Sequence, residues 1–278
     1  MKKIILFFLI GLSALQAVQA KGYGSSSSES SDYIQFGAGV NYLFGDLGGA
    51  NYNNSGYADY DFPYTRPSLD LAYIHDFSDD IGVRVSFMYN LFGGNDKHSR
   101  NSFREYLYTT NSFELSLQLI YYFLHTSIGR TSLDVYAFAG GAYNWYKTEW
   151  GCFVQGSEYA LRNRNGTGAI SSEHPDVDVD GEYSESDNRW KRSDGCFALP
   201  VGLGVRMPIT QTLNIGAEAG YRFAFGRSAD YIDGMETWYS NSNDMYFIFN
   251  LTVAYCFRGT QNYYSNRRKS HYGKFRRR

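Results

Sequence analysis

The chain has 278 residues, of which 43% are hydrophobic and 18% aromatic, and its formal net charge is −2. The aromatic content excludes a disordered chain, and the near-neutral charge leaves no overall basic footprint for nucleic acid. The mean hydropathy of −0.42 excludes a polytopic helical membrane protein, because each spanning helix needs about 20 mostly apolar residues. Transmembrane β-strands escape this test, because only every second residue faces the lipid.

The N-terminus has the pattern of a secretory signal peptide. A basic start precedes the apolar stretch Ile4–Leu15, and small residues stand at the positions that a signal peptidase reads before a cut after Ala20. We therefore expect export from the cytoplasm. The Ser-rich residues that follow have the composition of a flexible leader.

From residue 33 onward apolar residues alternate with polar or small ones, and this period of two is typical of β-strands with one apolar face. Eight segments have the pattern: Tyr33–Phe44, Pro67–Phe77, Ile81–Leu91, Leu107–Phe123, Leu133–Tyr146, Phe197–Met207, Leu213–Phe225 and Met245–Phe257. In the fifth segment Tyr136 and Phe138 interrupt the polar side, so the pattern leaves its outward face open.

The connections between these segments alternate between short and long, and aromatic residues gather at the strand ends. Short turns at one end, long loops at the other and aromatic girdles are typical of bacterial outer-membrane barrels. A soluble β-sandwich would bury its apolar face and would seldom need aromatics at both ends of nearly every strand. The sequence therefore predicts an all-β fold, an eight-stranded antiparallel transmembrane up-and-down β-barrel with long outer loops.

The expected organisation has four parts: a signal peptide over 1–20, the flexible leader over 21–32, the transmembrane barrel over 33–257 and a basic periplasmic tail over 258–278. An even strand number places both termini in the periplasm. We expect a monomeric barrel in the lipid of the cell outer membrane of a Gram-negative bacterium, with no nucleic-acid partner.

Four segments carry a resemblance to a known family. They are Asn41-Tyr42-Leu43-Phe44-Gly45-Asp46-Leu47-Gly48-Gly49, Phe113-Glu114-Leu115-Ser116, Pro200-Val201-Gly202-Leu203-Gly204-Val205-Arg206, and Glu218-Ala219-Gly220-Tyr221-Arg222 with Asp230-Tyr231-Ile232-Asp233. In this order they resemble the outer-membrane β-barrel family of largely unassigned function that includes the type IX secretion component PorG. The resemblance implies an eight-stranded barrel and a PorG-like role in protein secretion, as a structural anchor for periplasmic secretion-ring proteins.

Charged residues on the polar side of the strands predict a charge network in the lumen: Asp70, Arg84, Glu114, Arg206, Glu218 and Arg222. One interpretation is a paired-carboxylate site or an ion path. The other is a neutralised plug, because buried charges must be paired and an eight-stranded barrel holds little beyond its own side chains. Equal numbers of each sign favour the plug. The histidines are scattered, so no catalytic triad can be argued from spacing, and we expect no enzyme.

Two features of the long segment between the fifth and sixth strands suggest local sites. Cys152 and Cys196 bracket it, and in an oxidising compartment we expect them to form a disulfide. The residues Asp176, Asp178, Asp180 and Asp187 follow the D-x-D-x-D-G spacing of a calcium loop. The alternative is an acidic, solvated loop that binds no metal, and apart from this calcium we expect no cofactor.

The tail after Phe257 has eight basic residues and no acidic one, whereas the rest of the mature chain has 16 basic and 28 acidic residues. Such a block is typical of a disordered interaction arm, although an inert solvated tail has the same composition. The residues expected to contact a partner are Arg267, Arg268, Lys269, Arg276, Arg277 and Arg278. A periplasmic anchor is therefore one hypothesis, and a surface-exposed binding or adhesin-type barrel that works through its outer loops is the other.

Overall fold

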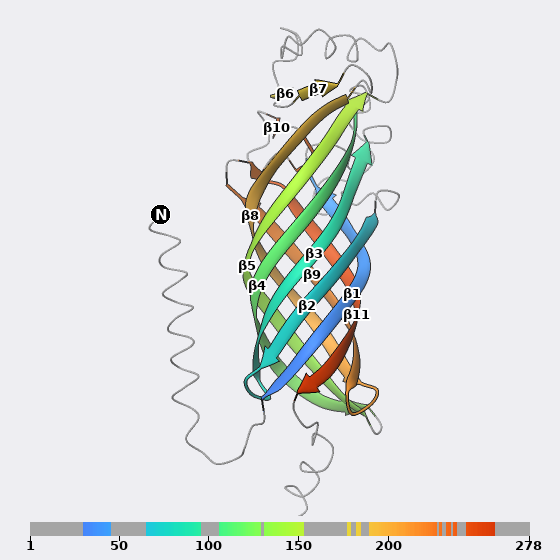
Figure 1. Ribbon diagram of the computed structural model, residues 1–278, viewed down its shortest axis with the longest axis vertical. Helices are drawn as coiled ribbons and strands as arrows, with labels where there is room; N and C mark the ends of the chain where they lie inside the picture. Colours follow the sequence, from blue (N-terminus) through green and yellow to red (C-terminus); the bar gives the residue numbers. More distant parts are fainter. Residues whose placement is uncertain are drawn as a thin grey trace, which may run out of the picture.

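The computed structural model shows an antiparallel sheet that closes on itself as a barrel (Figure 1). It describes residues 30–45, 65–95, 106–128, 131–152, 177–178, 182–184, 189–226, 228–229, 232–234, 236–237 and 243–258. Within these ranges there is no helix of the length and apolar character needed to cross a membrane.

Eight strands form the wall: β1 (Ser31–Phe44), β2 (Arg66–Asp76), β3 (Ile81–Asn95), β4 (Tyr106–Ile128), β5 (Thr131–Cys152), β8 (Arg189–Pro208), β9 (Leu213–Phe225) and β11 (Met245–Arg258). Each strand pairs with its neighbour in the sequence, β11 pairs with β1, and β5 pairs with β8. Three short strands lie outside the wall: β6 (Val177–Asp178) and β10 (Glu236–Thr237) pair with each other, and β7 (Glu182–Ser184) pairs with β8. The predicted all-β, eight-stranded antiparallel barrel is confirmed.

The two ends of the barrel differ, and we name them by their connections. The short-turn end carries the turns 77–80 and 209–212, the start of β1 and the end of β11 (Figure 1). The long-loop end carries the connections that lead from β1 to β2, β3 to β4, β5 to β8 and β9 to β11. This is the alternation that the sequence predicted.

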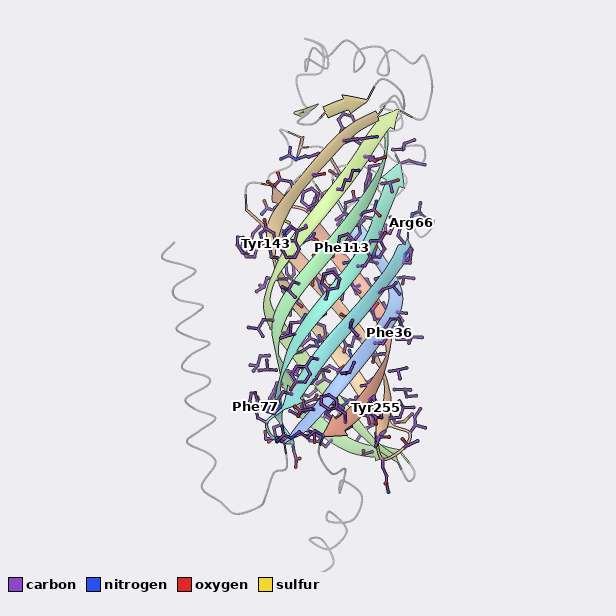
Figure 2. All side chains as sticks on the ribbon, in the orientation of Figure 1. Phe36, Arg66, Phe77, Phe113, Tyr143 and Tyr255 are labelled. Atoms are coloured by element: carbon purple, nitrogen blue, oxygen red, sulfur yellow. The ribbon has the colours of Figure 1, made fainter. Side chains whose placement is uncertain are left out.

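The barrel turns its apolar side chains outward and its polar side chains inward (Figure 2). Strand β2 shows this, since Leu69, Leu71 and Tyr73 are exposed while Ser68 and Asp70 are buried. Along β4 the outward apolar series runs from Phe113 to Phe123. At about 3.3 Å per residue and a tilt of about 40°, these ten steps span roughly 25 Å. That is the height of the apolar band of an outer-membrane barrel.

Strands β4, β5 and β8 continue beyond this band at the long-loop end (Figure 1). We call their extensions, Tyr106–Ser112, Tyr146–Cys152 and Arg189–Cys196, the wall extension. Its outer face is polar, with Lys147 and Glu149 pointing outward, and its inner face buries Trp150 and Tyr108. Seven or eight residues of each strand therefore stand roughly 15–20 Å above the apolar band.

Candidate functional site

The middle of the lumen is crossed by an ion pair between Arg84 of β3 and Glu218 of β9. The Arg84 Nη1 atom donates to both Glu218 oxygens at 2.7 Å. Around the closed ring, β3 and β9 are separated by three strands on either side, so this pair joins opposite walls. Both residues are buried, since the exposed fraction is 1% for Arg84 and 7% for Glu218.

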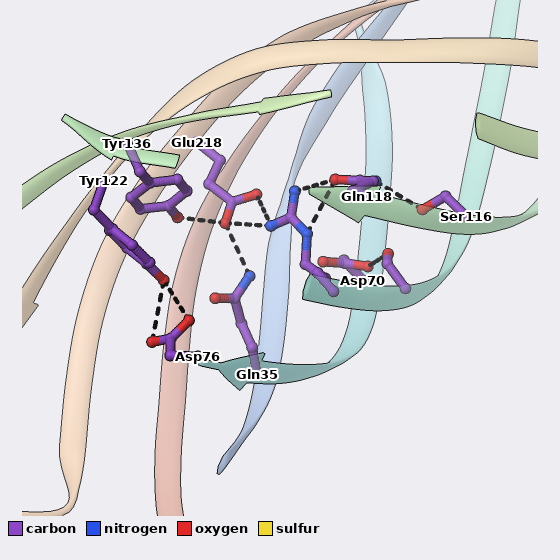
Figure 3. Close-up of polar contacts among 10 residues, drawn as sticks. Gln35, Asp70, Asp76, Ser116, Gln118, Tyr122, Tyr136 and Glu218 are labelled. Atoms are coloured by element: carbon purple, nitrogen blue, oxygen red, sulfur yellow. Dashed lines mark hydrogen bonds and ion pairs between the residues drawn. The ribbon is translucent and has the colours of Figure 1, made fainter. Parts of the chain in front are cut away.

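Other polar groups complete this middle layer, as Figure 3 shows. Glu218 also accepts hydrogen bonds from Tyr136 Oη at 2.6 Å and from Gln35 Nε2 at 3.0 Å. Arg84 Nε donates to Gln118 Oε1 at 3.0 Å, and the Arg84 guanidinium lies 4.5 Å from the centre of the Phe138 ring. Each charge therefore has several partners, which is what a buried ion pair needs in order to be tolerated.

A second ion pair crosses the lumen nearer the short-turn end. Arg206 Nη2 of β8 donates to Asp76 Oδ2 of β2 at 2.9 Å, and Tyr122 Oη donates to the same carboxylate. The Arg206 guanidinium also lies 4.6 Å from the Tyr33 ring centre and 4.7 Å from that of Tyr122. Strands β2 and β8 are again opposite in the ring, so this lower layer also joins opposite walls.

The upper layer, nearer the long-loop end, is held more loosely. Tyr246 Oη of β11 donates to Glu114 Oε2 of β4 at 2.6 Å, across opposite strands. Glu114 Oε1 lies 3.6 Å from Arg222 Nε, and neither of these two atoms makes a hydrogen bond in the described part of the chain. A polar contact of this length is one that a water molecule commonly bridges.

Glycines on β8 make room for the aromatic rings of β5 inside the barrel. A Cβ atom at Gly202 would lie 2.3 Å from Phe138 Cζ, and one at Gly204 would lie 2.3 Å from Tyr136 Cζ. These rings therefore pack directly against the backbone of the neighbouring strand. The face of the fifth strand that the sequence left open is settled by this packing, because Tyr136 and Phe138 are both buried in the lumen.

The six residues of the predicted charge network are all buried in the lumen. Four of them form the ion pairs Arg84–Glu218 and Arg222–Glu114. Arg206 pairs with Asp76, and Asp70 accepts a hydrogen bond from Ser86. The network predicted from the sequence did not include Asp76 or Tyr136. The signal for Tyr136 was its place on the polar face of β5, opposite the alternating glycines of β8.

The structure contradicts the expected disulfide between Cys152 and Cys196. Cys196 is a free, buried thiol, and its cross-strand partner on β5 is Asn144. Cys152 lies eight residues further along β5, which is about 26 Å of extended chain. Bridged cysteines have Cα atoms less than about 7 Å apart. The prediction was wrong because β5 and β8 continue as paired strands where a loop was expected.

The other predicted sites lie mostly outside the described residues. This applies to Asp176, Asp180 and Asp187 of the calcium motif and to the six basic residues of the tail, while Asp178 is described only through its backbone in β6. In the described part of the chain no three His, Cys, Asp or Glu side chains are placed to hold a metal ion. Two histidines near the short-turn end pair with carboxylates, His75 with Asp32 at 2.5 Å and His125 with Asp134 at 2.8 Å.

An apolar outer belt around a polar, filled lumen defines a transmembrane β-barrel of the outer-membrane type. No family model matches the sequence, and no curated protein matches it.

Solved barrels are similar to the chain in fold. One is the N-terminal barrel domain of Pseudomonas aeruginosa OprF, at 12% identity over 83% of this chain and 98% of that one, with a TM-score of 0.41. Another is Ail of Yersinia pestis with the heparin analogue sucrose octasulfate, at 14% identity over 84% and 100%, with a TM-score of 0.40. A third is the Neisserial surface protein NspA, at 12% identity over 82% and 99%, with a TM-score of 0.43. At these identities the likeness concerns the fold alone.

Proposed function

We propose that this protein is a non-enzymatic outer-membrane barrel that acts as a structural anchor for a periplasmic assembly, similar in role to PorG of type IX secretion. In this proposal the short-turn end, with both termini, faces the periplasm, and the long-loop end faces the outside. The observation that supports an anchor most directly is the filled lumen.

A channel needs a continuous polar path along the barrel axis, whereas here side chains from opposite strands meet at three levels. The pairs are Asp76–Arg206, Arg84–Glu218 and Glu114–Tyr246. An eight-stranded barrel is just wide enough for its own side chains, so paired groups that reach across its diameter leave little room for a solute. The lumen therefore favours a role as a membrane-embedded support over one in transport.

The partner surface in this proposal is the short-turn end together with the basic tail. Arg258, the first residue of the tail, is exposed and lies 3.8 Å from Asp32 of β1, so the tail starts at the barrel rim. An arm with several arginines fits an acidic partner surface, because guanidinium groups bind carboxylates in a two-pronged geometry. We infer that the tail residues contact a periplasmic ring protein while a single barrel stays in the lipid.

A second candidate function is binding at the cell surface, and the wall extension favours it. This paired segment of β4, β5 and β8 rises well above the apolar band, and β6 pairs with β10, which joins two of the connections at this end. Rigid scaffolds that present loops are typical of binding proteins.

Co-purification from mild detergent separates the two functions. We would compare the parent with two variants: one with the six partner-binding basic residues of the tail changed to Gln, and one with Lys147→Gln and Lys191→Gln at the long-loop end as a matched control. An anchor should recover periplasmic proteins with the parent and with the control, and lose them with the tail variant. Recovery that is unaffected by the tail variant, or the absence of any periplasmic protein from the parent, would contradict the anchor.

A further inference from the structure

A charged cluster lies on the outer face of the barrel at the short-turn end. Asp32 of β1 stands opposite His75 of β2 and opposite Arg258 of β11 in the strand register. Side chains of directly opposite residues point to the same face of a sheet. His75 comes two residues after Tyr73, which is exposed on the outer face of β2, and side chains two residues apart share a face. The cluster therefore points away from the lumen.

Asp32 is the centre of this cluster, and its neighbours shield it. Tyr73 Oη donates to Asp32 Oδ1 at 2.8 Å, and His75 Nδ1 lies 2.5 Å from the same oxygen. Only 6% of the Asp32 side chain is exposed, although it faces outward. Both contacts come from β2, so the carboxylate of β1 is fixed in place by the neighbouring strand.

The carboxylate of Asp32 orients the Arg258 side chain at the end of β11. Arg258 Nε lies 3.8 Å from Asp32 Oδ2, and the Arg258 backbone oxygen accepts a hydrogen bond from the Cys256 thiol at 3.3 Å. The ion pair lies on the Nε side of the guanidinium, and 75% of the Arg258 side chain is exposed. The guanidinium is therefore held at one edge and accessible to a ligand at the other.

Arg258 stands at the edge of the apolar belt. On β11 the outward residues Tyr255 and Phe257 are exposed, and Arg258 follows directly. The rings of Tyr73 and Phe257 lie 6.3 Å apart, and Figure 2 places Phe77 and Tyr255 at the same end of the barrel. Aromatic belts mark the headgroup level of a bilayer. The Arg258 guanidinium is thus at the depth where lipid phosphates lie.

We propose that Arg258 binds the phosphate group of a phospholipid in the leaflet at the short-turn end, with Asp32 as a positioning residue. A planar guanidinium donates two parallel hydrogen bonds to a phosphate. The acyl chains of the same lipid lie against the exposed belt residues Tyr73, Leu71 and Leu69 of β2. Because Asp32 holds the guanidinium in advance, less side-chain freedom is lost on binding.

The surroundings of Arg258 favour a lipid over a soluble anion. Among the described residues of the short-turn end, Arg258 is the one arginine or lysine that faces outward, because Arg206 points into the lumen against the Tyr33 ring. A soluble phosphate would meet a single guanidinium beside a carboxylate that repels it. A phospholipid adds contacts between its acyl chains and the exposed rings next to Arg258. The inference does not rest on the anchoring function proposed above.

Photo-cross-linking locates the bound lipid. The full-length mature protein is folded in dodecyl maltoside, a detergent without phosphate, and receives phosphatidylglycerol with a diazirine near the headgroup end of one acyl chain. Mass spectrometry of the illuminated protein then maps the cross-links. We expect more cross-links at Tyr73 and Phe257 than at Phe123, which is exposed at the same end on β4 and serves as the internal reference.

The perturbing variant is Arg258→Gln, which removes the charge and the guanidinium. It should lower cross-linking at Tyr73 and Phe257, relative to Phe123, by about tenfold, because hydrogen bonds between charged groups are lost. The matched control is Lys147→Gln, which removes a cation with 57% of its side chain exposed at the opposite end of the barrel. It should leave this ratio as in the parent. Faster gel migration before heating verifies that each variant is folded.

Two further arms separate the sources of the phosphate. A diacylglycerol with the same diazirine chain but no phosphate should show no preference for Tyr73 and Phe257. Excess unlabelled phosphatidylglycerol should remove the preference of the phospholipid probe, whereas inorganic phosphate at the same concentration should not. Cross-linking at Tyr73 and Phe257 that equals the reference in the parent, or that is unchanged in Arg258→Gln, would overturn the proposal. Displacement by inorganic phosphate would also overturn it, because the ligand would then be a free anion.

Discussion

Removing one partner of the Arg84–Glu218 pair should destabilise the folded barrel far more than removing both. In the variant Glu218→Leu, the Arg84 guanidinium stays buried in the lumen without its carboxylate, and Tyr136 and Gln35 lose their acceptor. Breaking a buried ion pair in this way costs about 3–5 kcal/mol of unfolding free energy. The reverse change, Arg84→Met, strands the Glu218 charge and should cost a similar amount.

The double variant Arg84→Met, Glu218→Leu leaves no unpaired charge, and Met and Leu fill a similar volume. Replacing a buried ion pair by apolar residues is often neutral or stabilising, so the double variant should be no less stable than either single variant. The coupling free energy of the double-mutant cycle should then be about 3 kcal/mol or more. Urea unfolding of the protein in lipid vesicles, followed by tryptophan fluorescence, measures all four corners. Single changes that each cost less than about 1 kcal/mol, or costs that simply add in the double variant, would refute the interpretation that charges on opposite strands pair across the lumen.

Three further predictions concern the wall, the outer loops and the cell. Gly204→Val should destabilise the barrel by about 2 kcal/mol or more in the same assay, because the valine side chain would overlap Tyr136. Gly141→Val should be tolerated, because a Cβ atom at that position meets nothing within 4 Å. Calcium at about 1 mM should protect the outer loops from proteolysis, compared with a sample in chelator. The reason is that Asp178 lies opposite Glu236 in the β6–β10 pair, and a bound cation would relieve the repulsion between these like charges. Equal digestion in both conditions would show that the acidic surface binds no metal. The protein should fractionate with the outer membrane and migrate faster on a gel before heating than after it, and recovery in the soluble periplasm would contradict the membrane assignment.

The strand number and the inward face of most strands could be predicted from the sequence, because a membrane imposes one repeated pattern on every strand. Within the apolar band most outward residues are apolar and most inward residues are small or polar, as Leu69 and Asp70 show on β2. Above the band this rule no longer holds. On β5 the outward residue Lys147 is polar and the inward residue Trp150 is buried, so the pattern that identified the strands no longer marked them.

The same loss of the alternating pattern explains the error about the cysteines. The predicted sixth strand began at Phe197, but β8 begins at Arg189 and pairs with β5 up to Gly151. This continued pairing moves Cys196 from the base of a loop into the wall of the barrel, next to Asn144. A disulfide prediction that depends on where a loop starts fails when the strands are longer than their apolar stretch.

The partners across the lumen could not be predicted, although their residues could. Alternation identifies Arg84, Arg206 and Glu218 as inward-facing, but which of them meet depends on the shear of the barrel and on each strand's place in the ring. The contacts that Ser228 and Ile232 make with the barrel could not be predicted for another reason. Ser228 and Ile232 lie in a connection with no periodic pattern, and their hydrogen bonds go to side chains such as Tyr146 and Thr110 that are far away in the sequence.

Electrical recording across a planar lipid bilayer tests the filled lumen most directly. The full-length mature protein, folded and inserted from detergent, should give no stepwise conductance above the background of empty bilayers in concentrated KCl, because paired side chains block the axis at the levels of Arg84–Glu218 and Asp76–Arg206. A heat-unfolded sample serves as the control for artefacts of detergent. Reproducible single-channel steps from the folded protein, absent from that control, would contradict the filled lumen and with it the proposal of an anchor.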